Sequence, residues 1–454
     1  MNYNKKSFRY YYWFFFEFIK KNVFLIIISI FITVIIIISL TSFTPQITNI
    51  LFPQQNIIGL IGAYNQSNLP DDITKKITNS LLYINSKGEY VPALANSWEV
   101  TNNGLIYKFY LKKDLLWNDG KLFTANDIKL DFKDVKTTAV DKHIIQFQLK
   151  DRLAIFPNYL TKPLFKSSLV GVAGFYHVDQ YKIKDSLITS VILSPTKRNL
   201  PRITYKFYND EKTLINAYKL GEVNEIIIYR KSLMDNFIHW PGTKIKKNVD
   251  YSKLMTLFIN TQRPMLKEKE IRSAIGLAVN RSLFNQFGYE ANSPVLPVSW
   301  AYNRQLKRNL YDKQSASETV KKFQEATRSA KLNLNTFFEY NDTADIISEN
   351  LSEIGLSNQI NIVSSVNLNQ YDLFLMIWNP PFDPDQYYFW HSTQTNNNIS
   401  GYKNVKIDKL LEDGRNSINI NERKKIYDEF QKVIVDDNPA IFLYYPYIYR
   451  IIRM

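Results

Sequence analysis

The sequence contains no cysteine, only four histidines, and no charged residue between Lys21 and Asp71. Without cysteine, the chain has no disulfide scaffold, no zinc site built on thiolates, no iron–sulfur cluster and no cysteine nucleophile. Attachment to a membrane through a lipid-modified N-terminal cysteine is excluded for the same reason. These absences remove several classes of redox, metal and lipid-anchored protein together.

Motifs of the common enzyme classes are also missing. The sequence has no G-x-S-x-G, H-E-x-x-H, G-x-x-x-x-G-K-[ST] or G-x-G-x-x-G. His143, His177, His239 and His391 lie far apart and show no metal-ligand spacing. We therefore predict no enzymatic activity, no metal and no cofactor. We interpret His391 as an ordinary core or surface residue, with a place in the ligand cleft or contact with a metal chelate as the alternative. A carboxylate pair formed by folding leaves an extracytoplasmic hydrolase as an alternative.

One long apolar run stands near the N-terminus. Val23–Leu40 contains no charge, proline or glycine, and it meets the length of about 18 residues that a spanning helix needs. The apolar region of a signal peptide has only about 7–15 residues, and no A-x-A cleavage pattern follows here. We therefore predict a retained transmembrane helix over residues 23–42 in preference to a cleaved signal.

The charges beside this run predict its direction in the membrane. Five basic residues precede it, against the single acidic residue Glu17: Lys5, Lys6, Arg9, Lys20 and Lys21. The positive-inside rule places residues 1–22 in the cytoplasm and everything after Thr41 outside. The aromatic block Tyr10–Phe18 is typical of an interfacial belt or of a helix that lies on the membrane. The predicted location is the cytoplasmic membrane, with a single pass and an extracytoplasmic C-terminal part.

The composition is that of a globular protein with more than one lobe. The chain has 454 residues, 45% of them hydrophobic and 22% charged, and a formal net charge of +15. A single core rarely grows beyond about 250–300 residues. No basic run is interleaved with aromatic residues, so we predict no nucleic-acid binding. We interpret the basic excess as a solvated face, with proximity to anionic lipid as the alternative.

Strand and helix patterns alternate after a polar, proline-containing tether over residues 43–55. Short apolar or alternating runs predict strands at Ile203–Asn209, Glu225–Tyr229 and Leu373–Trp378. Two sets of apolar residues each share one helical face: Ile271, Ala274, Ile275 and Ala278, and then Ile426, Phe430, Val433 and Ile434. The fold class is therefore α/β, with mixed sheets.

The segment after Trp117 has clear local signals. Asp119-Gly120 predicts a turn in which glycine supplies a positive φ. Thr124 and Asp127 have the spacing of a capping box, so we predict that a helix begins there.

Six groups of motifs, in the same order along the chain, carry a resemblance to a known family. They are Pro92–Val100 with Asn103–Tyr107; Trp117–Ile128; Gly221–Asn224; Phe258–Asn260 with Ile271–Arg281; Tyr371–Trp378 with Asp383–Asp385; and Ser400–Tyr402 with Leu410–Glu412. This pattern closely resembles the family 5 extracellular solute-binding proteins, the oligopeptide-, dipeptide- and nickel-binding components of ABC importers. The resemblance runs from about Ile57 to Ile452.

The resemblance implies a two-lobed periplasmic-binding-protein-like (type II) fold with an extra subdomain, preceded here by one transmembrane helix. Lobe 1 would comprise residues 56–250, with a subdomain at about 91–162, and would be completed by residues 421–454. Lobe 2 would comprise residues 251–420. The C-terminal segment would return to lobe 1 as a strand.

The resemblance also implies that the protein binds a solute and catalyses no reaction. The lobes would close on an elongated peptide or peptide-like solute and present it to ABC permease subunits. We expect a monomer. A tethered sensory or scaffold module is the alternative, although a tail of about 22 residues is too short for a signalling domain of its own.

The family's loop after a sheet strand suggests ligand-contacting residues. Trp378 is predicted to stack on the ligand, with a core role as the alternative. Asp383 and Asp385 are predicted to meet a cation such as a peptide ammonium, with capping of the next helix as the alternative. The remaining predicted contacts are Asn379, Tyr387, Asn260 and Trp300.

The sequence departs from the family pattern in this loop. Peptide-binding members carry an aspartate there that pairs with the ligand's ammonium, whereas Pro380 or Pro381 occupies the matching position. Either Asp383 substitutes for that aspartate, or the ligand lacks a free N-terminus. The degraded glycine-rich element Gly171–Tyr176 is a second departure, and we hypothesise a changed specificity within the family.

Overall fold

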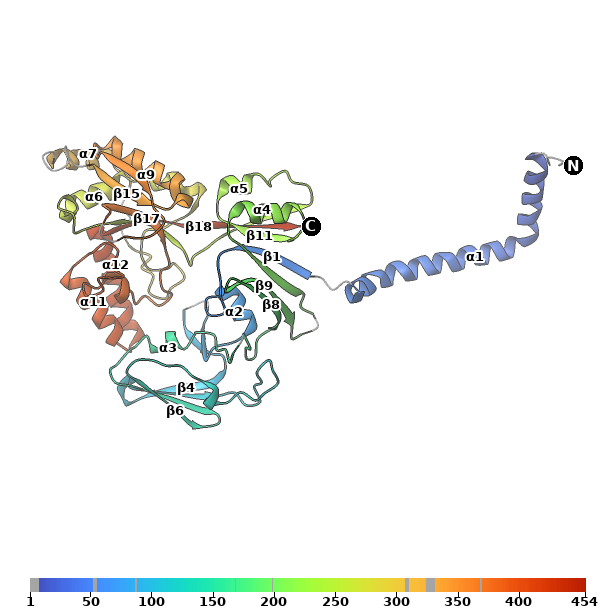
Figure 1. Cartoon of the computed structure of the whole chain (residues 1–454), viewed down its shortest axis with the longest axis horizontal. Helices are drawn as coiled ribbons and strands as arrows, with labels where there is room; N and C mark the ends of the chain where they lie inside the picture. Colours follow the sequence, from blue (N-terminus) through green and yellow to red (C-terminus); the bar gives the residue numbers. More distant parts are fainter. Residues whose placement is uncertain are drawn as a thin grey trace.

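The computed structural model describes residues 8–51, 55–85, 88–167, 169–197, 199–306, 310–323, 331–367 and 370–454. Helix α1 (Phe8–Leu51) extends away from an α/β body (Figure 1). Asn22 interrupts it with φ −118° and ψ 20°. The helix continues beyond residue 42, so residues 43–51 of the predicted tether are helical; residues 52–54 lie outside the described part of the chain.

The first lobe is built on a mixed sheet. Its strands are β1 (Gln55–Ile61), β8 (Tyr176–Lys184), β9 (Leu187–Pro195), β10 (Arg202–Tyr208), β11 (Glu225–Ile228) and β12 (Thr243–Val249). Its helices are α2 (Asp71–Ile77), α4 (Glu211–Lys219) and α5 (Lys231–Asp235). Strand β1 is parallel to both β10 and β11. The predicted strands at 203–209 and 225–229 are confirmed.

A second, smaller sheet falls inside the predicted subdomain range. Its antiparallel order is β4 (Ala95–Thr101), β5 (Ile106–Leu111), β7 (Ile144–Leu149) and β6 (Val135–Asp141). The hairpin β2 (Leu82–Ile84) and β3 (Tyr90–Pro92) and the short helix α3 (Phe156–Tyr159) adjoin it. Buried aromatic side chains such as Phe109 and Phe147 fill its core. Thr124 and Asp127 form the predicted capping box, but the expected helix is only the 3-10 turn Ala125–Asp127.

The second lobe has its own sheet and most of the helices. Its strands are β13 (Leu254–Ile259), β14 (Gly288–Glu290), β15 (Leu332–Thr336), β16 (Asn358–Ile362) and β17 (Leu373–Trp378). Its helices are α6 (Lys269–Ala278), α7 (Lys313–Lys322), α9 (Asn341–Glu353), α10 (Tyr387–Trp390), α11 (Val405–Asn416) and α12 (Ile420–Asp437). Strand β15 is parallel to β16 and β17, whereas β13 is antiparallel to β17.

Helix α12 corrects the predicted lobe boundary at residue 420. Its buried side chains Tyr427, Phe430 and Ile434 belong to the same core cluster as Leu254 and Trp378 of the second lobe. The sequence pattern predicted the buried face of this helix but not the lobe against which it packs. Residues 421–437 therefore belong to the second lobe.

Strand β18 (Ala440–Arg453) joins the two lobes. Its first part pairs with β13, and its last part pairs with β11 and β12. The chain passes between the lobes a second time where β12 leads into β13, and there the amide of Asp250 donates to the carbonyl of Pro446 (2.9 Å). Figure 1 shows β18 running from one lobe into the other. The two passes lie side by side, and the predicted C-terminal strand is confirmed.

Candidate functional site

The parallel strands of each lobe end on the side that is turned toward the other lobe. We call the segments that follow these strand ends the inter-lobe face. In the first lobe, Gly62 follows β1 and Tyr229 follows β11; in the second, Phe337 follows β15 and Asn379 follows β17. Open α/β sheets bind ligands outside the carboxyl ends of their strands. The inter-lobe face is therefore the region of this fold in which topology favours a binding site.

Electrostatic coupling shows that groups on the two lobes approach each other at this face. Burial raises the pKa of Glu211 in α4, Arg230 at 3.0 Å opposes that rise, and Glu339 of the second lobe adds to it. The side chain of Glu339 must therefore lie near α4. The carboxylates of Glu211 and Glu339, one from each lobe, are thus close enough to influence each other.

Polar and aromatic side chains lie around the first pass of the chain between the lobes. The Tyr229 hydroxyl donates to Asp250 (3.0 Å), and the Lys253 ammonium lies 3.9 Å from the centre of the Tyr229 ring. Burial lowers the pKa of Lys253, and Asp250 only partly opposes this effect. These residues place a lysine whose pKa is held below its ordinary value beside the connection between the lobes.

The Lys253→Met variant is expected to change how stability depends on pH. Because the folded state releases the Lys253 proton at a lower pH than the unfolded chain does (pKa about 10.4), the wild-type free energy of unfolding should rise relative to the variant across that alkaline interval. Urea unfolding at stepped pH values measures the difference. Parallel curves would contradict the expectation, and Lys267→Met, at an exposed lysine, is the control.

Asp383 is buried in an internal ion pair. One carboxylate oxygen accepts from Arg423 (2.8 Å) and from the amide of Asp385 (3.0 Å), and the other accepts from the Tyr90 hydroxyl (3.0 Å). The side chains of Asp383 and Arg423 are 1% and 4% exposed. Burial and then Asp383 raise the pKa of Tyr90. In this structure the cation that Asp383 meets is Arg423, and Tyr90 adds a first-lobe residue to the network.

Asp385 forms a second buried pair close by. It accepts from Arg415 Nε (2.9 Å) and from the amide of Tyr387 (3.1 Å), the first amide of α10, a contact of the kind that the capping alternative predicts. The Arg415 guanidinium lies 4.1 Å from the centre of the Tyr387 ring. Burial raises the pKa of Asp385, whereas Arg415 opposes the rise. The carbonyl of Arg415 accepts from Ala154 of the first lobe (2.7 Å), so this pair also borders the contact between lobes.

Trp378 and Asn379 differ sharply in solvent exposure although they are adjacent in the sequence. The Trp378 ring packs 5.3 Å from that of Phe389 and 5.9 Å from that of Trp390, and it is only 4% exposed. The structure thus gives Trp378 the core role that the sequence left as an alternative. Asn379, in contrast, is exposed at the end of β17 and lies on the inter-lobe face.

Trp300 lies where the lobes touch. The Arg423 guanidinium is 5.1 Å from the centre of its ring, and the first-lobe residue Gly88 approaches so closely that a Cβ there would lie 3.1 Å from the indole. The loop around Trp300, with Lys424 and Asp428 of α12, lines a cavity of about 800 Å³. Trp300 and Asp383 are therefore brought together through Arg423.

Asn260 is separated from the other predicted residues. Because β13 and β17 are antiparallel, Ile259 pairs with Leu373 at the start of β17, whereas Leu254 pairs with Trp378 at its end. Asn260 therefore lies at the opposite end of the sheet from the inter-lobe face. The fold therefore does not bring Asn260 and Trp378 together, although both were predicted to contact the ligand.

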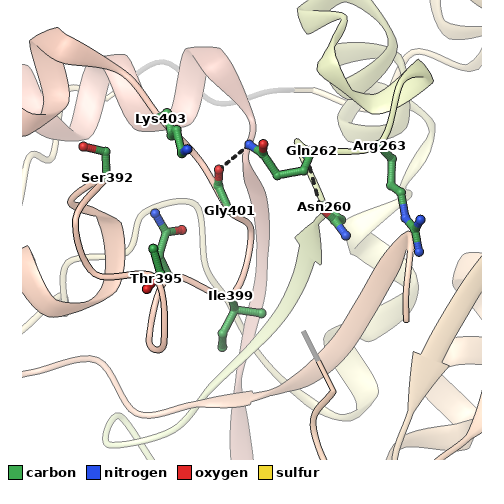
Figure 2. Close-up of a pocket in the computed structure, with 9 residues that line it drawn as sticks. Asn260, Gln262, Arg263, Ser392, Thr395, Ile399, Gly401 and Lys403 are labelled. Atoms are coloured by element: carbon green, nitrogen blue, oxygen red, sulfur yellow. Dashed lines mark hydrogen bonds between the residues drawn. The ribbon is translucent and has the colours of Figure 1, made fainter. Parts of the chain in front are cut away.

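Asn260 instead lines a polar cavity of about 330 Å³, shown in Figure 2. Its amide donates to the carbonyl of Tyr371 (3.0 Å), and its side-chain oxygen accepts from the amide of Gln262 (3.1 Å). Gln262 in turn donates to the carbonyl of Gly401 (2.7 Å). These contacts make Asn260 a structural residue that fastens the end of β13 to the loops beside it.

Comparison with known proteins decides the family. The model of the bacterial extracellular solute-binding proteins, family 5 Middle, matches residues 89–148 and 131–400, well over half of the chain. The chain belongs to this family. The predicted resemblance is confirmed, and the family and its relatives are solute-binding proteins and not enzymes.

The solute-binding protein is similar to its relatives over most of its length. It is 23% identical to the oligopeptide-binding protein AppA of Bacillus subtilis (strain 168), and the alignment covers 87% of each chain. The structure of NikZ from Campylobacter jejuni in complex with Ni(L-His) superposes with a TM-score of 0.73 at 22% identity, covering 88% of this chain and 94% of that one. The B. subtilis AppA structure in complex with a nonapeptide gives 0.68 at 22% identity, with 88% and 94% covered. These likenesses confirm the predicted two-lobed α/β fold.

Sequence reasoning missed the arginines of the solute-binding protein that neutralise the two aspartates. Arg423 stands four residues before Tyr427 and seven before Phe430, so it lies on the buried face of α12. A charged residue in phase with an apolar stripe signals a buried ion pair, because such residues are rarely buried without a partner. That signal was present in the sequence, but the identity of the partner was not.

Potential metal ligands are dispersed over the described part of the solute-binding protein. Across the ranges that the structure describes, no three histidine, aspartate or glutamate side chains are grouped so that they could hold a metal ion. His391 is 4% exposed, stacks 4.1 Å from the Tyr387 ring and hydrogen-bonds to Thr393 through Nδ1 (2.8 Å). It is a core residue, as we interpreted it from the sequence.

Proposed function

We propose that this chain is a membrane-anchored extracytoplasmic solute-binding protein of an ABC importer, which captures oligopeptide-like ligands between its lobes and delivers them to a permease. One observation carries the proposal: two α/β lobes present the carboxyl ends of their parallel strands to the inter-lobe face, and in the described ranges two passes of chain join them. Such connections allow hinge closure around a ligand.

The oligopeptide-like ligand class rests on the relatives and on the shape of the proposed site. The AppA complex contains a nonapeptide, and the AppA relative is named for oligopeptide binding. Exposed strand ends such as that at Asn379 offer backbone groups to an extended ligand, and these contacts tolerate many side-chain sequences. NikZ holds a nickel–histidine complex, so the fold alone does not restrict the ligand to peptides.

The internal contacts of Asp383 bear on the form of the ligand. Both of its carboxylate oxygens already accept hydrogen bonds from Arg423, Tyr90 or the amide of Asp385. With Pro380 and Pro381 beside it, this loop offers no free carboxylate to an ammonium. These observations support the second version of our specificity hypothesis, a ligand that does not place a free N-terminus here.

The helix α1 supports the anchoring part of the proposal. Residues Arg9–Ile38 are long and apolar enough to cross a membrane, and their side chains are not buried against the rest of the protein. Leu and Ile side chains exposed in such a number are costly in water but stable in lipid. The helix precedes the lobes, so a single crossing would leave them next to a membrane permease.

Ligand capture is tested on the full chain, purified from its own host and inserted into nanodiscs. Native mass spectrometry is expected to show a co-purified solute, and calorimetry with that solute gives its Kd. Asn379→Trp, which fills the inter-lobe face, is expected to weaken binding at least about tenfold, or about 1.4 kcal/mol. Asn397→Trp is the matched control, because Asn397 is also exposed but lies in the loop beside the Asn260 cavity.

Equal Kd values for the two tryptophan variants would contradict a ligand site between the lobes. Tight binding of ordinary di- to pentapeptides with a free amine, unchanged by Asp383→Ala, would contradict both versions of the specificity hypothesis. Recovery of permease subunits with the captured protein would support import. Recovery of kinases or wall enzymes alone would favour a sensory role.

A further inference from the structure

Helix α1 consists of two arms that meet at Asn22. The first arm, Phe8–Lys21, ends at the non-helical φ and ψ of that residue, and Figure 1 shows it turned away from the long second arm. The candidate span Arg9–Ile38 has 30 residues, or about 45 Å at 1.5 Å per residue, against an apolar bilayer core of about 30 Å. The second arm is long enough to cross that core without the first.

The first arm has two different faces. At 100° per residue, its four charged residues fall within about 120° of the helix: Arg9, Glu17, Lys20 and Lys21. Tyr10 and Trp13 share that sector. The rest of the circumference carries only apolar or aromatic side chains: Tyr11, Tyr12, Phe14, Phe15, Phe16, Phe18 and Ile19. This is the pattern of a helix that lies in a membrane surface.

The apolar face of the first arm is open. Phe15 is 65% exposed and Phe14 is 62% exposed, and every side chain of that face is at least 37% exposed. An aromatic surface of this size needs a partner in water. The rest of the described chain does not supply one, because α1 projects away from the lobes (Figure 1).

We propose that the first arm lies flat in the headgroup layer of the cytoplasmic leaflet and binds an anionic lipid surface. The inference rests on the proposed anchoring by the second arm and adds a separate contact to it. The three basic residues Arg9, Lys20 and Lys21 outnumber the single acid Glu17 on the outward face, which complements anionic headgroups. The aromatic face enters the boundary between headgroups and acyl chains, to a depth of about 5–10 Å.

The absence of cysteine makes site-specific labelling direct. Single-cysteine variants Trp13→Cys and Phe15→Cys of the full chain are spin-labelled in nanodiscs of phosphatidylcholine with phosphatidylglycerol, and their access to oxygen and to a water-soluble nickel chelate is compared. The two positions differ by only about 3 Å along the helix axis but lie on opposite faces. The oxygen-to-chelate ratio is expected to be severalfold higher at position 15 than at position 13, and to fall at position 15 in pure phosphatidylcholine.

Three further labels distinguish the ways in which the inference could fail. Tyr11→Cys and Phe18→Cys share the apolar face and are about 10 Å apart along the axis, so a flat arm gives them the same depth and a crossing arm does not. Ile30→Cys reports on the second arm. Similar oxygen-to-chelate ratios at positions 13 and 15, or different depths at positions 11 and 18, would overturn the inference about the first arm. If the Ile30 label is deep in the bilayer in the same experiment, the proposed anchoring by the second arm still holds. An Ile30 label in water would instead overturn the anchor, and an unchanged ratio in pure phosphatidylcholine would overturn the preference for anionic lipid.

Discussion

Replacing Arg423 with methionine is expected to lower the free energy of unfolding by about 3–5 kcal/mol. Methionine retains most of the side-chain volume but leaves the Asp383 carboxylate buried beside Tyr90 without its cation. A charge in that position cannot be solvated, because the aspartate side chain is only 1% exposed. Urea unfolding of the full chain in detergent, followed by tryptophan fluorescence, measures the loss.

Two further variants isolate the ion pair from packing. Adding Asp383→Asn to Arg423→Met should recover part of the lost stability, because the double variant no longer buries an unpaired charge. Arg202→Met is the matched control: Arg202 pairs with Asp179 at the surface, where both side chains are more than a third exposed, and such pairs contribute at most about 1 kcal/mol. A double variant less stable than Arg423→Met alone would contradict the ion-pair explanation.

Two lysines in the second arm of α1 are expected to release the protein from the membrane. Ile30→Lys combined with Thr33→Lys places two charges near the middle of the apolar run. Each costs about 2.5–3.5 kcal/mol at the centre of a spanning helix, so insertion weakens by about 5–7 kcal/mol. The fraction of protein left in the pellet after alkaline carbonate extraction measures the effect.

The control replaces the same two positions with apolar residues, Ile30→Leu and Thr33→Val, and should stay in the pellet. Retention of the double-lysine variant would mean that another part of the chain holds the membrane. The intact mass of the wild-type protein tests the other alternative. A chain that begins after Thr41 would show that the helix is a cleaved signal and not an anchor.

Elements with strong local patterns could be predicted from the sequence. The apolar run Leu373–Trp378 becomes the buried strand β17, and the face shared by Ile271 and Ile275 packs in the second-lobe core. The turn at Gly120 has the expected positive φ of 81°. In each case the signal lies within a few residues, because periodicity and turn chemistry are local properties.

The errors concern pairings between distant residues. The direction of β13 against β17 places Asn260 away from Trp378, and no local pattern specifies that antiparallel choice. Asp383 pairs with Arg423, which lies 40 residues later in the chain. The buried face of α12 can be recognised in the sequence, but the sequence pattern does not show which lobe covers it. Such contacts depend on topology, which propensity and periodicity do not determine.

The last residues of the chain complete the sheets of both lobes. Strand β18 lies between β13 on one side and β11 on the other, so neither sheet is whole before Ala440–Arg453 is in place. During synthesis this segment emerges after all the strands with which it pairs, and pairings over so long a stretch of sequence form slowly. Both halves of the protein must therefore wait for the same 14 residues. A nascent chain stalled before Ala440 would expose two unfinished sheet edges at once, each a template for aggregation.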